Sequence, residues 1–325
     1  MSKQKVLLLG ATGETGTSIL NSLLTLNKFE ITALVRPSSA EKPDVQALTE
    51  KGVKILIADI SGPAEELINA LTGIDVVISA IGGMAQMAQM GLVEAAKKAG
   101  VKRFVPCDFA SVCPVGVMML RDEKEEIHTQ IKKLGLGYTF IDVGYWYQLS
   151  FPPLPSGRTS YAMFPGMQVP LHGDGEAKNI LIDIRDIGHF VARIIDDERT
   201  LNKYVYGWGD ILTENQIYDM MEEVSGEKLE RVYVPDEEVV AQEKQLLQAF
   251  ENDKTNVRLR IGVMSTQYAI SKYVRRDNTP ENAKSLGYLD ARELYPDLKP
   301  KSFKEFVGDL VDGKVQRPYA KGMSM

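Results

Sequence analysis

The chain has 325 residues, of which 44% are hydrophobic, and a formal net charge of −6. It is long enough for one large or two ordinary domains with a substantial core, and no apolar run approaches the roughly 20 residues that span a bilayer. The negative charge argues against a nucleic-acid surface, and two cysteines and three scattered histidines give neither a disulfide framework nor a metal-ligand spacing. We therefore expect a cytoplasmic protein without membrane, nucleic-acid or metal partners.

The first predicted element is a buried strand over residues 6–9, a continuous apolar run that leads into a glycine-rich loop. Gly10 would allow a tight exit from the strand, Gly13 the close approach of a pyrophosphate, and Gly16 the close packing of a helix over 18–26. The amino end of that helix would face the phosphates. The loop predicts a dinucleotide site, and the residues expected to bind the cofactor are Gly10, Thr12, Gly13, Thr15 and Gly16.

A second buried strand is predicted over residues 31–35, and it ends at Arg36, 20 residues beyond Gly16. An enzyme that prefers NAD usually has an acidic residue here, which accepts from the ribose hydroxyls. An arginine would instead pair with the 2′-phosphate of NADP, and Lys42 would be a second cation for it. The alternative is a solvent-exposed loop arginine. The position favours NADPH.

Strand and helix patterns then alternate as far as residue 143. This alternation predicts an α/β fold, a Rossmann-type doubly wound parallel sheet whose ligands lie beyond the carboxyl ends of the strands. The predicted strands are 53–58, 75–80, 103–106 and 138–143, and the predicted helices are 45–51, 64–71, 85–99 and 122–134.

Three residues at the ends of these strands are expected to contact the cofactor. Asp59 would accept from the adenine amino group, although a turn-forming aspartate is an equal alternative. Ser79 and Ala80 are small enough for the backbone to approach the ribose on the nicotinamide side.

The pattern changes near residue 151, because the proline-rich run 151–157 cannot form a regular helix or a central strand. This change predicts an NADP-binding domain over 1–150, with a returning segment around 176–200, and a smaller mixed α/β substrate domain over 151–325. Within these parts we expect a strand at 178–183 that returns to the sheet, a helix to about 196, short strands at 204–206 and 230–234, and helices at 214–224 and 237–250.

A resemblance to a known family rests, in order, on residues 10–16, 34–39, 75–83, 101–106, 173–178, 186–188, 196–203, 232–238 and 293–297. These segments resemble the isoflavone reductase-like group of atypical short-chain dehydrogenases. This group includes phenylcoumaran benzylic ether reductases and pinoresinol-lariciresinol reductases, and NmrA-like proteins share its fold. A homodimer is common in the family, and no residue here argues for or against one. The resemblance covers nearly the whole chain.

The resemblance implies a catalytic lysine. The family pattern Lys-x-x-Ile-Arg, before the sixth strand, is matched by Lys124-Glu-Glu-Ile-His128, with histidine in place of arginine. Lys124 would give or take a proton near the nicotinamide, with water or His128 as a relay. The alternative is a surface lysine paired with its acidic neighbours, which are Asp122, Glu123, Glu125 and Glu126.

The resemblance also places the walls of the site. Family members usually have Pro-Ser-Glu-Phe-Gly after the fifth strand, where this chain has Pro-Cys-Asp-Phe-Ala at 106–110. Pro106 and Phe109 are expected beside the nicotinamide. Met84 would line an adaptable apolar pocket, unless it belongs to the core. The aromatic residues that would stack on a planar substrate or pack between the domains are Tyr145, Trp146 and Tyr147.

One further match has the Tyr-x-x-x-Lys spacing of ordinary short-chain dehydrogenases. It is formed by Tyr268 and Lys272, well beyond the predicted sheet. About one such match is expected by chance among 13 tyrosines, so we interpret the spacing as coincidental.

Together these features predict an NADPH-dependent reductase of an aromatic small molecule, of a phenylpropanoid, lignan-like or isoflavonoid-like kind. The alternative is an NmrA-like protein that senses NADP(H) without turnover. Such proteins generally lack the catalytic residue, so Lys124 favours the enzyme.

Overall fold

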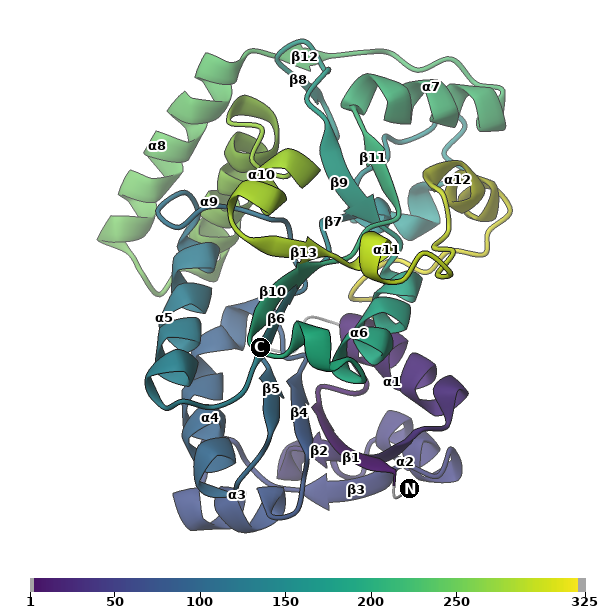
Figure 1. Ribbon diagram of the computed structural model, residues 1–325. Helices are drawn as coiled ribbons and strands as arrows, with labels where there is room; N and C mark the ends of the chain where they lie inside the picture. The colour runs from purple at the N-terminus through teal and green to yellow at the C-terminus, as the bar shows by residue number, and fades with distance from the viewer. Residues whose placement is uncertain (1–2, 321–325) are drawn as a thin grey trace.

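The computed structural model describes residues 3–320, and the lower half of the view in Figure 1 is built around a five-stranded parallel sheet with the order β3-β2-β1-β4-β5. The order reverses at β1, which lies between β2 and β4, and doubly wound sheets bind their ligands at such a switch point. The five strands are β1 (Gln4–Leu9), β2 (Phe29–Val35), β3 (Lys54–Ile57), β4 (Val76–Ser79) and β5 (Arg103–Val105).

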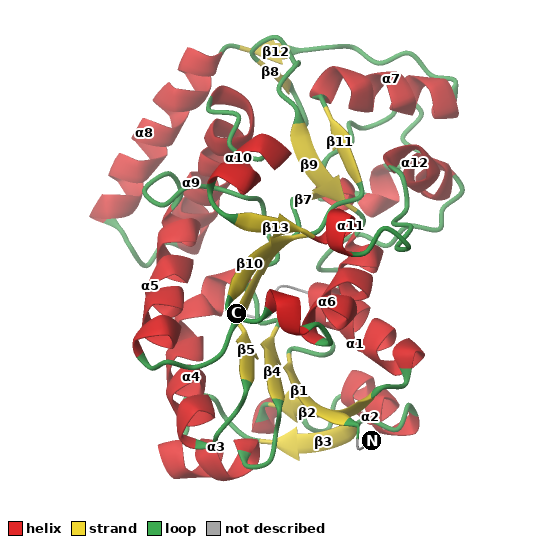
Figure 2. Ribbon diagram, viewed as in Figure 1, coloured by secondary structure: helices red, strands yellow, loops and turns green. Residues whose placement is uncertain are grey.

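Helices cover both faces of this sheet (Figure 2). Because neighbouring side chains of a strand point to opposite faces, Val6 and Leu8 join one apolar cluster, while Leu7 and Leu9 join another. The predicted doubly wound α/β fold is confirmed. Its helices are α1 (Glu14–Leu26), α2 (Pro43–Glu50), α3 (Ala64–Leu71), α4 (Gln89–Lys98), α5 (Met119–Lys133) and α6 (Ile187–Ile195).

The parallel pairing continues beyond β5 into strands from later in the chain. A single bridge joins Phe104 to Tyr138 at the start of β6 (Thr139–Asp142). Strand β6 then pairs with β10 (Lys203–Tyr206), and β10 pairs with β13 (Tyr288–Asp290). The second half of the chain therefore completes the sheet that the first half begins.

The strand predicted at 178–183 exists as β9 (Asn179–Ile182), but it does not return to the main sheet. It pairs in parallel with β7 (Tyr145–Trp146) and antiparallel with β11 (Asp210–Leu212). The prediction was wrong here because a short apolar run indicates a buried strand without indicating its neighbours.

Helix α6 is the part of the returning segment that packs on the half of the molecule built around the five-stranded sheet. The amide of Gly188 donates to Ser18 Oγ at 2.9 Å, and Ser18 Oγ donates to the carbonyl of Arg185 at 2.9 Å. A side chain at Gly188 would place its Cβ 2.0 Å from the Ser18 carbonyl oxygen. Only glycine allows α6 to pack this closely on α1.

The remaining elements form a smaller layered part with its own apolar cluster, which includes Phe151, Met221 and Phe306. No helix within residues 3–320 is long and apolar enough to cross a membrane. The division of the chain at residue 150 stays a prediction. The elements are β8 (Leu171–His172), α7 (Glu214–Ser225), β12 (Tyr233–Val234), α8 (Asp236–Asn252), α9 (Val257–Ala269), α10 (Pro280–Ser285), α11 (Ala291–Leu294) and α12 (Phe303–Val311).

Candidate functional site

The glycine loop between β1 and α1 forms a tight cradle at the switch point of the sheet. Gly10 has a φ of +81°, and a Cβ there would lie 2.4 Å from the Ala80 carbonyl oxygen. A Cβ at Gly16 would lie 1.9 Å from the Gly10 carbonyl oxygen. Thr12 and Gly13 are exposed, Thr15 is half-buried, and the N-cap Gly13 adds no side-chain cap to α1. These features fit a dinucleotide pyrophosphate bound at the helix amino end.

The predicted 2′-phosphate residues lie at the same edge of the sheet. Leu9 of β1 pairs with Leu34 of β2, so Gly10 and Arg36 both follow the carboxyl ends of adjacent parallel strands. Arg36 is exposed, and so is Lys42, the N-cap of α2. This placement is compatible with the predicted phosphate contacts.

The residues after β3 and β4 differ in their surroundings. Asp59 is exposed, and its Oδ1 accepts from the Ser61 amide at 2.9 Å, which is the turn-forming role. Its contact with adenine stays a prediction. Ser79 is fully buried and its hydroxyl has no hydrogen-bond partner within residues 3–320, whereas Ala80 is partly exposed beside Gly10.

The loop after β5 is tied to the loop after β4. Pro106 is buried, and Phe109 packs in the apolar cluster that also holds Val105 and Ile141. Cys107 Sγ donates to the Ile81 carbonyl at 2.9 Å. Burial raises the pKa of the Cys107 thiol to about 12, so the thiol stays protonated at neutral pH.

Lys124 is buried on α5, with 5% of its surface exposed, and its Nζ donates to the backbone carbonyl of Asp108. If Lys124 were a surface lysine, as the alternative proposed, it would form ion pairs with the neighbouring acids. No carboxylate in the described part of the chain pairs with Lys124. Glu123 instead binds Arg260 at 2.7 Å, and Glu125 binds Arg121 at 3.1 Å. The structure therefore contradicts the surface alternative.

His128 connects Asp108 to Glu125. Its Nε2 lies 2.9 Å and 3.0 Å from the two carboxylate oxygens of Asp108, and its Nδ1 lies 3.3 Å from Glu125 Oε2. The ring stacks on Phe140, with a centroid separation of 3.6 Å. Both ring nitrogens are engaged, and Asp108 links His128 to Lys124. Sequence reasoning missed Asp108, although an acidic residue in the loop after a strand was a signal.

The surroundings of His128 favour its charged form. Burial lowers the pKa of His128, but the charge of Asp108 and the hydrogen bonds with Asp108 and Glu125 together raise it above its ordinary value. A raised folded-state pKa stabilises the protein fully below the unfolded pKa near 6.5, and the contribution is lost as pH rises through the folded value.

We therefore expect His128→Asn to lower the free energy of unfolding more at about pH 5.5 than at about pH 9. Urea denaturation at both pH values measures the difference. His189→Asn is a suitable control, because His189 also pairs with an acid, Asp186, but its side chain is 56% exposed. An equal loss at both pH values for His128→Asn would show that His128 is not charged in the folded protein.

A second buried acid lies near enough to Lys124 to feel its charge. Asp142, at the end of β6, accepts from the Tyr288 hydroxyl at 2.6 Å. Burial raises its pKa, which the charges of Lys124 and Arg121 partly oppose. No local pattern in the sequence indicated this pair, because Tyr288 comes from β13, far along the chain.

The predicted aromatic residues separate into two groups. Tyr145 and Trp146 are partly exposed on β7. Tyr147 is fully buried, with its ring against Phe303 at 5.1 Å and its hydroxyl donating to the Lys301 carbonyl at 3.1 Å. Tyr147 is therefore a core residue, which agrees with the packing alternative and contradicts the prediction that it stacks on the substrate.

Tyr268 and Lys272 lie beside Tyr145. The Tyr268 ring is 5.6 Å from that of Tyr145, and Lys272 Nζ is 3.3 Å from the Tyr145 ring centroid. Lys272 also donates to the Tyr273 hydroxyl at 3.1 Å, and burial lowers its pKa to about 7. Tyr268 and Lys272 thus pack against the Tyr145 ring, and we call Tyr145, Trp146, Tyr268 and Lys272 the aromatic wall. Their interpretation as a coincidental match did not anticipate this contact.

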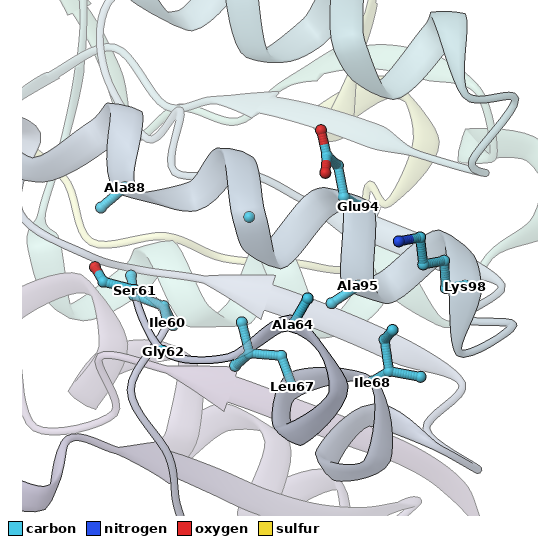
Figure 3. Close-up of a pocket in the computed structure, with 11 residues that line it drawn as sticks. Ile60, Ser61, Gly62, Ala64, Leu67, Ile68, Ala88, Glu94, Ala95 and Lys98 are labelled. Atoms are coloured by element: carbon cyan, nitrogen blue, oxygen red, sulfur yellow. The ribbon is translucent and has the colours of Figure 1, made fainter.

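A separate hollow adjoins the loop after β3, next to Asp59. This cavity of about 280 Å³ between α3 and α4 is lined by residues such as Ile60, Leu67, Glu94 and Lys98 (Figure 3). None of the predicted site residues lines it, and Met84 lies outside it on the short helical turn Gly83–Ala88. No group of three or more metal-binding side chains occurs among residues 3–320.

Comparison with known proteins places the chain among reductases and dehydrogenases. It is 42% identical over 313 residues to Asnovolin J 5',6'-dehydrogenase nvfM of Aspergillus novofumigatus, with 95% of each chain covered. It is 31% identical over 321 residues to an isoflavone reductase-like protein of Olea europaea, covering 95% of this chain and 99% of that one.

Two solved structures share the architecture. Leucoanthocyanidin reductase with NADPH from Vitis vinifera matches with a TM-score of 0.79 at 23% identity, covering 95% of this chain and 99% of that one. An isoflavone reductase matches with a TM-score of 0.77 at 25% identity, covering 94% and 99%. The resemblance to isoflavone reductase-like proteins is confirmed. Because the NmrA-like family matches residues 2–307, the chain belongs to that family.

Proposed function

We propose that the protein is an NADPH-dependent oxidoreductase that transfers a hydride between the cofactor and an aromatic small molecule, of a phenylpropanoid, lignan-like or isoflavonoid-like kind. The observation that carries the proposal is a buried lysine, Lys124, whose ammonium is fixed on the loop after β5 at the carboxyl edge of the sheet. Relatives named as reductases or dehydrogenases over nearly the full length of the chain support it.

The cofactor fits the residues present. The cradle of Gly10, Gly13 and Gly16 would hold the pyrophosphate, Arg36 and Lys42 would bind the 2′-phosphate, and the loop from Pro106 to Phe109 would lie beside the nicotinamide. When the cofactor is bound, its nicotinamide supplies or accepts the hydride. The Vitis vinifera structure of the same fold is an NADPH complex.

The protein's own chemistry is the transfer of a proton. Lys124 Nζ has one donor engaged by the Asp108 carbonyl, which leaves its other protons for a substrate atom that gains charge as hydride arrives. His128 binds the Asp108 carboxylate and so restrains the residue that orients Lys124. We propose Lys124 as the catalytic residue and His128 as a positioning residue.

The proposal is tested by titrating the protein with NADPH and NADH, followed by a panel of phenolic enones and benzylic ethers in the same cuvette. The panel is also run in reverse with NADP⁺, since one relative is named a dehydrogenase. NADPH preference with turnover supports the proposal. Tight NADPH binding without turnover in either direction favours a cofactor sensor instead.

Arg36 sets the expected cofactor preference. Arg36→Asp should weaken NADPH binding by roughly 10- to 100-fold relative to NADH, because it removes a charge-assisted contact and adds a repelling charge. Fluorescence titration with both cofactors measures the ratio, and Arg158→Asp, in the region after residue 150, is the control. An equal loss for the two cofactors would show that Arg36 does not contact the phosphate.

A further inference from the structure

The end of the described chain returns to the glycine loop. Beyond α12, Val315 is still buried in the apolar cluster of the smaller part, with 6% of its surface exposed. Four residues later, the amide of Tyr319 donates to Glu14 Oε1 at 2.8 Å. Glu14 is the first residue of α1, directly after Gly13. This segment lies outside residues 2–307, which the family matches.

The side chain of Tyr319 faces the aromatic wall on the opposite side. Its ring centroid is 6.0 Å from that of Trp146 and 6.5 Å from that of Phe164. Burial raises the pKa of the Tyr319 phenol, and the neighbouring Cys107, Glu14 and Tyr145 raise it further. Tyr319 is therefore close to the loop after β5, to the glycine loop and to β7 at once.

The backbone at Tyr319 is held in an unfavourable conformation. Its φ is +55°, a left-handed value that a bulky residue rarely adopts. Such strain persists only where the surroundings fix it, and here the Glu14 contact and the neighbouring rings of Trp146 and Phe164 do so. Tyr319 is therefore the point at which this segment is held between α1 and the aromatic wall.

We infer that residues 315–320 form a strap across the cofactor and substrate site, and that Tyr319 is a wall of the substrate pocket that determines which acceptors fit. The inference rests on the proposed function. The strap connects the core of the smaller part to the first turn of α1, so it limits both the escape of the cofactor and the size of the acceptor.

Two substitutions at one position test the wall. Tyr319→Ala should raise the KM for an aromatic acceptor at least ten-fold, because it removes the ring that packs with Trp146. Tyr319→Phe keeps the ring and the amide, so its KM should stay within two-fold of wild type. An unchanged KM in Tyr319→Ala, or an equal defect in Tyr319→Phe, would overturn the assignment of the ring.

Truncation after Gln316 tests the strap. Stopped-flow fluorescence should show NADPH leaving the truncated protein at least five-fold faster than the full chain, since the segment that closes the site is gone. An unchanged rate of NADPH dissociation would overturn the inference. If NADPH association were faster at the same time, the segment would be a competitor of the cofactor and not a strap that closes over it.

A measurement without cofactor separates this inference from the proposed function. Glu14→Ala removes the acceptor of the Tyr319 amide, so trypsin should cleave after Lys314 faster than in wild type. Glu65→Ala, at an exposed glutamate in the first turn of α3, is the matched control and should leave cleavage unchanged. Equal cleavage in both variants would show that Glu14 does not hold the strap, whether or not the protein turns over an acceptor.

Discussion

Lys124→Met is expected to lower turnover by roughly two to four orders of magnitude while NADPH affinity stays within about two-fold of wild type. Methionine has a similar length and suits the buried position, because it removes a charge without leaving a large cavity. The loss should therefore appear in kcat, and the melting temperature should not fall. Cofactor titration and steady-state kinetics on the same preparation measure both quantities.

Two further variants make this prediction specific. Lys133→Met changes an exposed lysine at the end of the same helix, and it should leave turnover unchanged. Asp108→Asn keeps the backbone carbonyl that binds Lys124 but weakens the contact with His128, so a smaller loss is expected. Full activity in Lys124→Met would exclude the lysine from the chemistry and assign the proton transfer to another group.

Gly16→Ala is expected to abolish measurable NADPH binding, because the new methyl group would lie 1.9 Å from the Gly10 carbonyl oxygen. Relieving this contact must move either α1 or the loop that binds the pyrophosphate. Gly13→Ala is the milder variant, since its Cβ would lie 3.3 Å from the same oxygen. Gly13→Ala should fold and bind NADPH more weakly than wild type. The prediction can therefore still be tested if Gly16→Ala does not fold.

Gly308→Ala is the matched control for the effect of alanine in a helix. Gly308 lies in α12, and a Cβ added there would meet no neighbouring atom of the described chain within 4 Å. Alanine should therefore stabilise the protein by up to about 1 kcal/mol. Urea denaturation and NADPH titration of the variants measure the two effects. Normal binding by Gly16→Ala would show that the cradle adapts to a side chain.

The half of the molecule that is built around the five-stranded sheet was predictable, because the sequence patterns that indicate its strands and helices are local. Strands buried on both faces appear as continuous apolar runs, as at 6–9 and 76–78, and the first run leads directly into the glycine loop. The later elements were less predictable because their pairing is not local. Strand β13 takes its place through β10, whose other partner, β6, lies far earlier in the chain.

The site shows the same limit. Lys124 could be inferred from a resemblance, but its partner is a backbone carbonyl, and a carbonyl carries no sequence signature. Tyr147 was assigned to the pocket together with Tyr145, yet β7 ends at Trp146 and a helical turn begins at Tyr147. The change of backbone sends the Tyr147 side chain into the core, which no spacing rule would have indicated.

The contributions of β10, β13 and α6 to the nucleotide half bear on how the protein emerges from the ribosome. A nascent chain that ends near residue 150 would expose β6 as an open strand edge, and the face of α1 that receives Gly188 would be bare. We expect such a fragment to aggregate when it is expressed alone. The nucleotide-binding half is thus assembled late in synthesis, after residues up to about 290 are available.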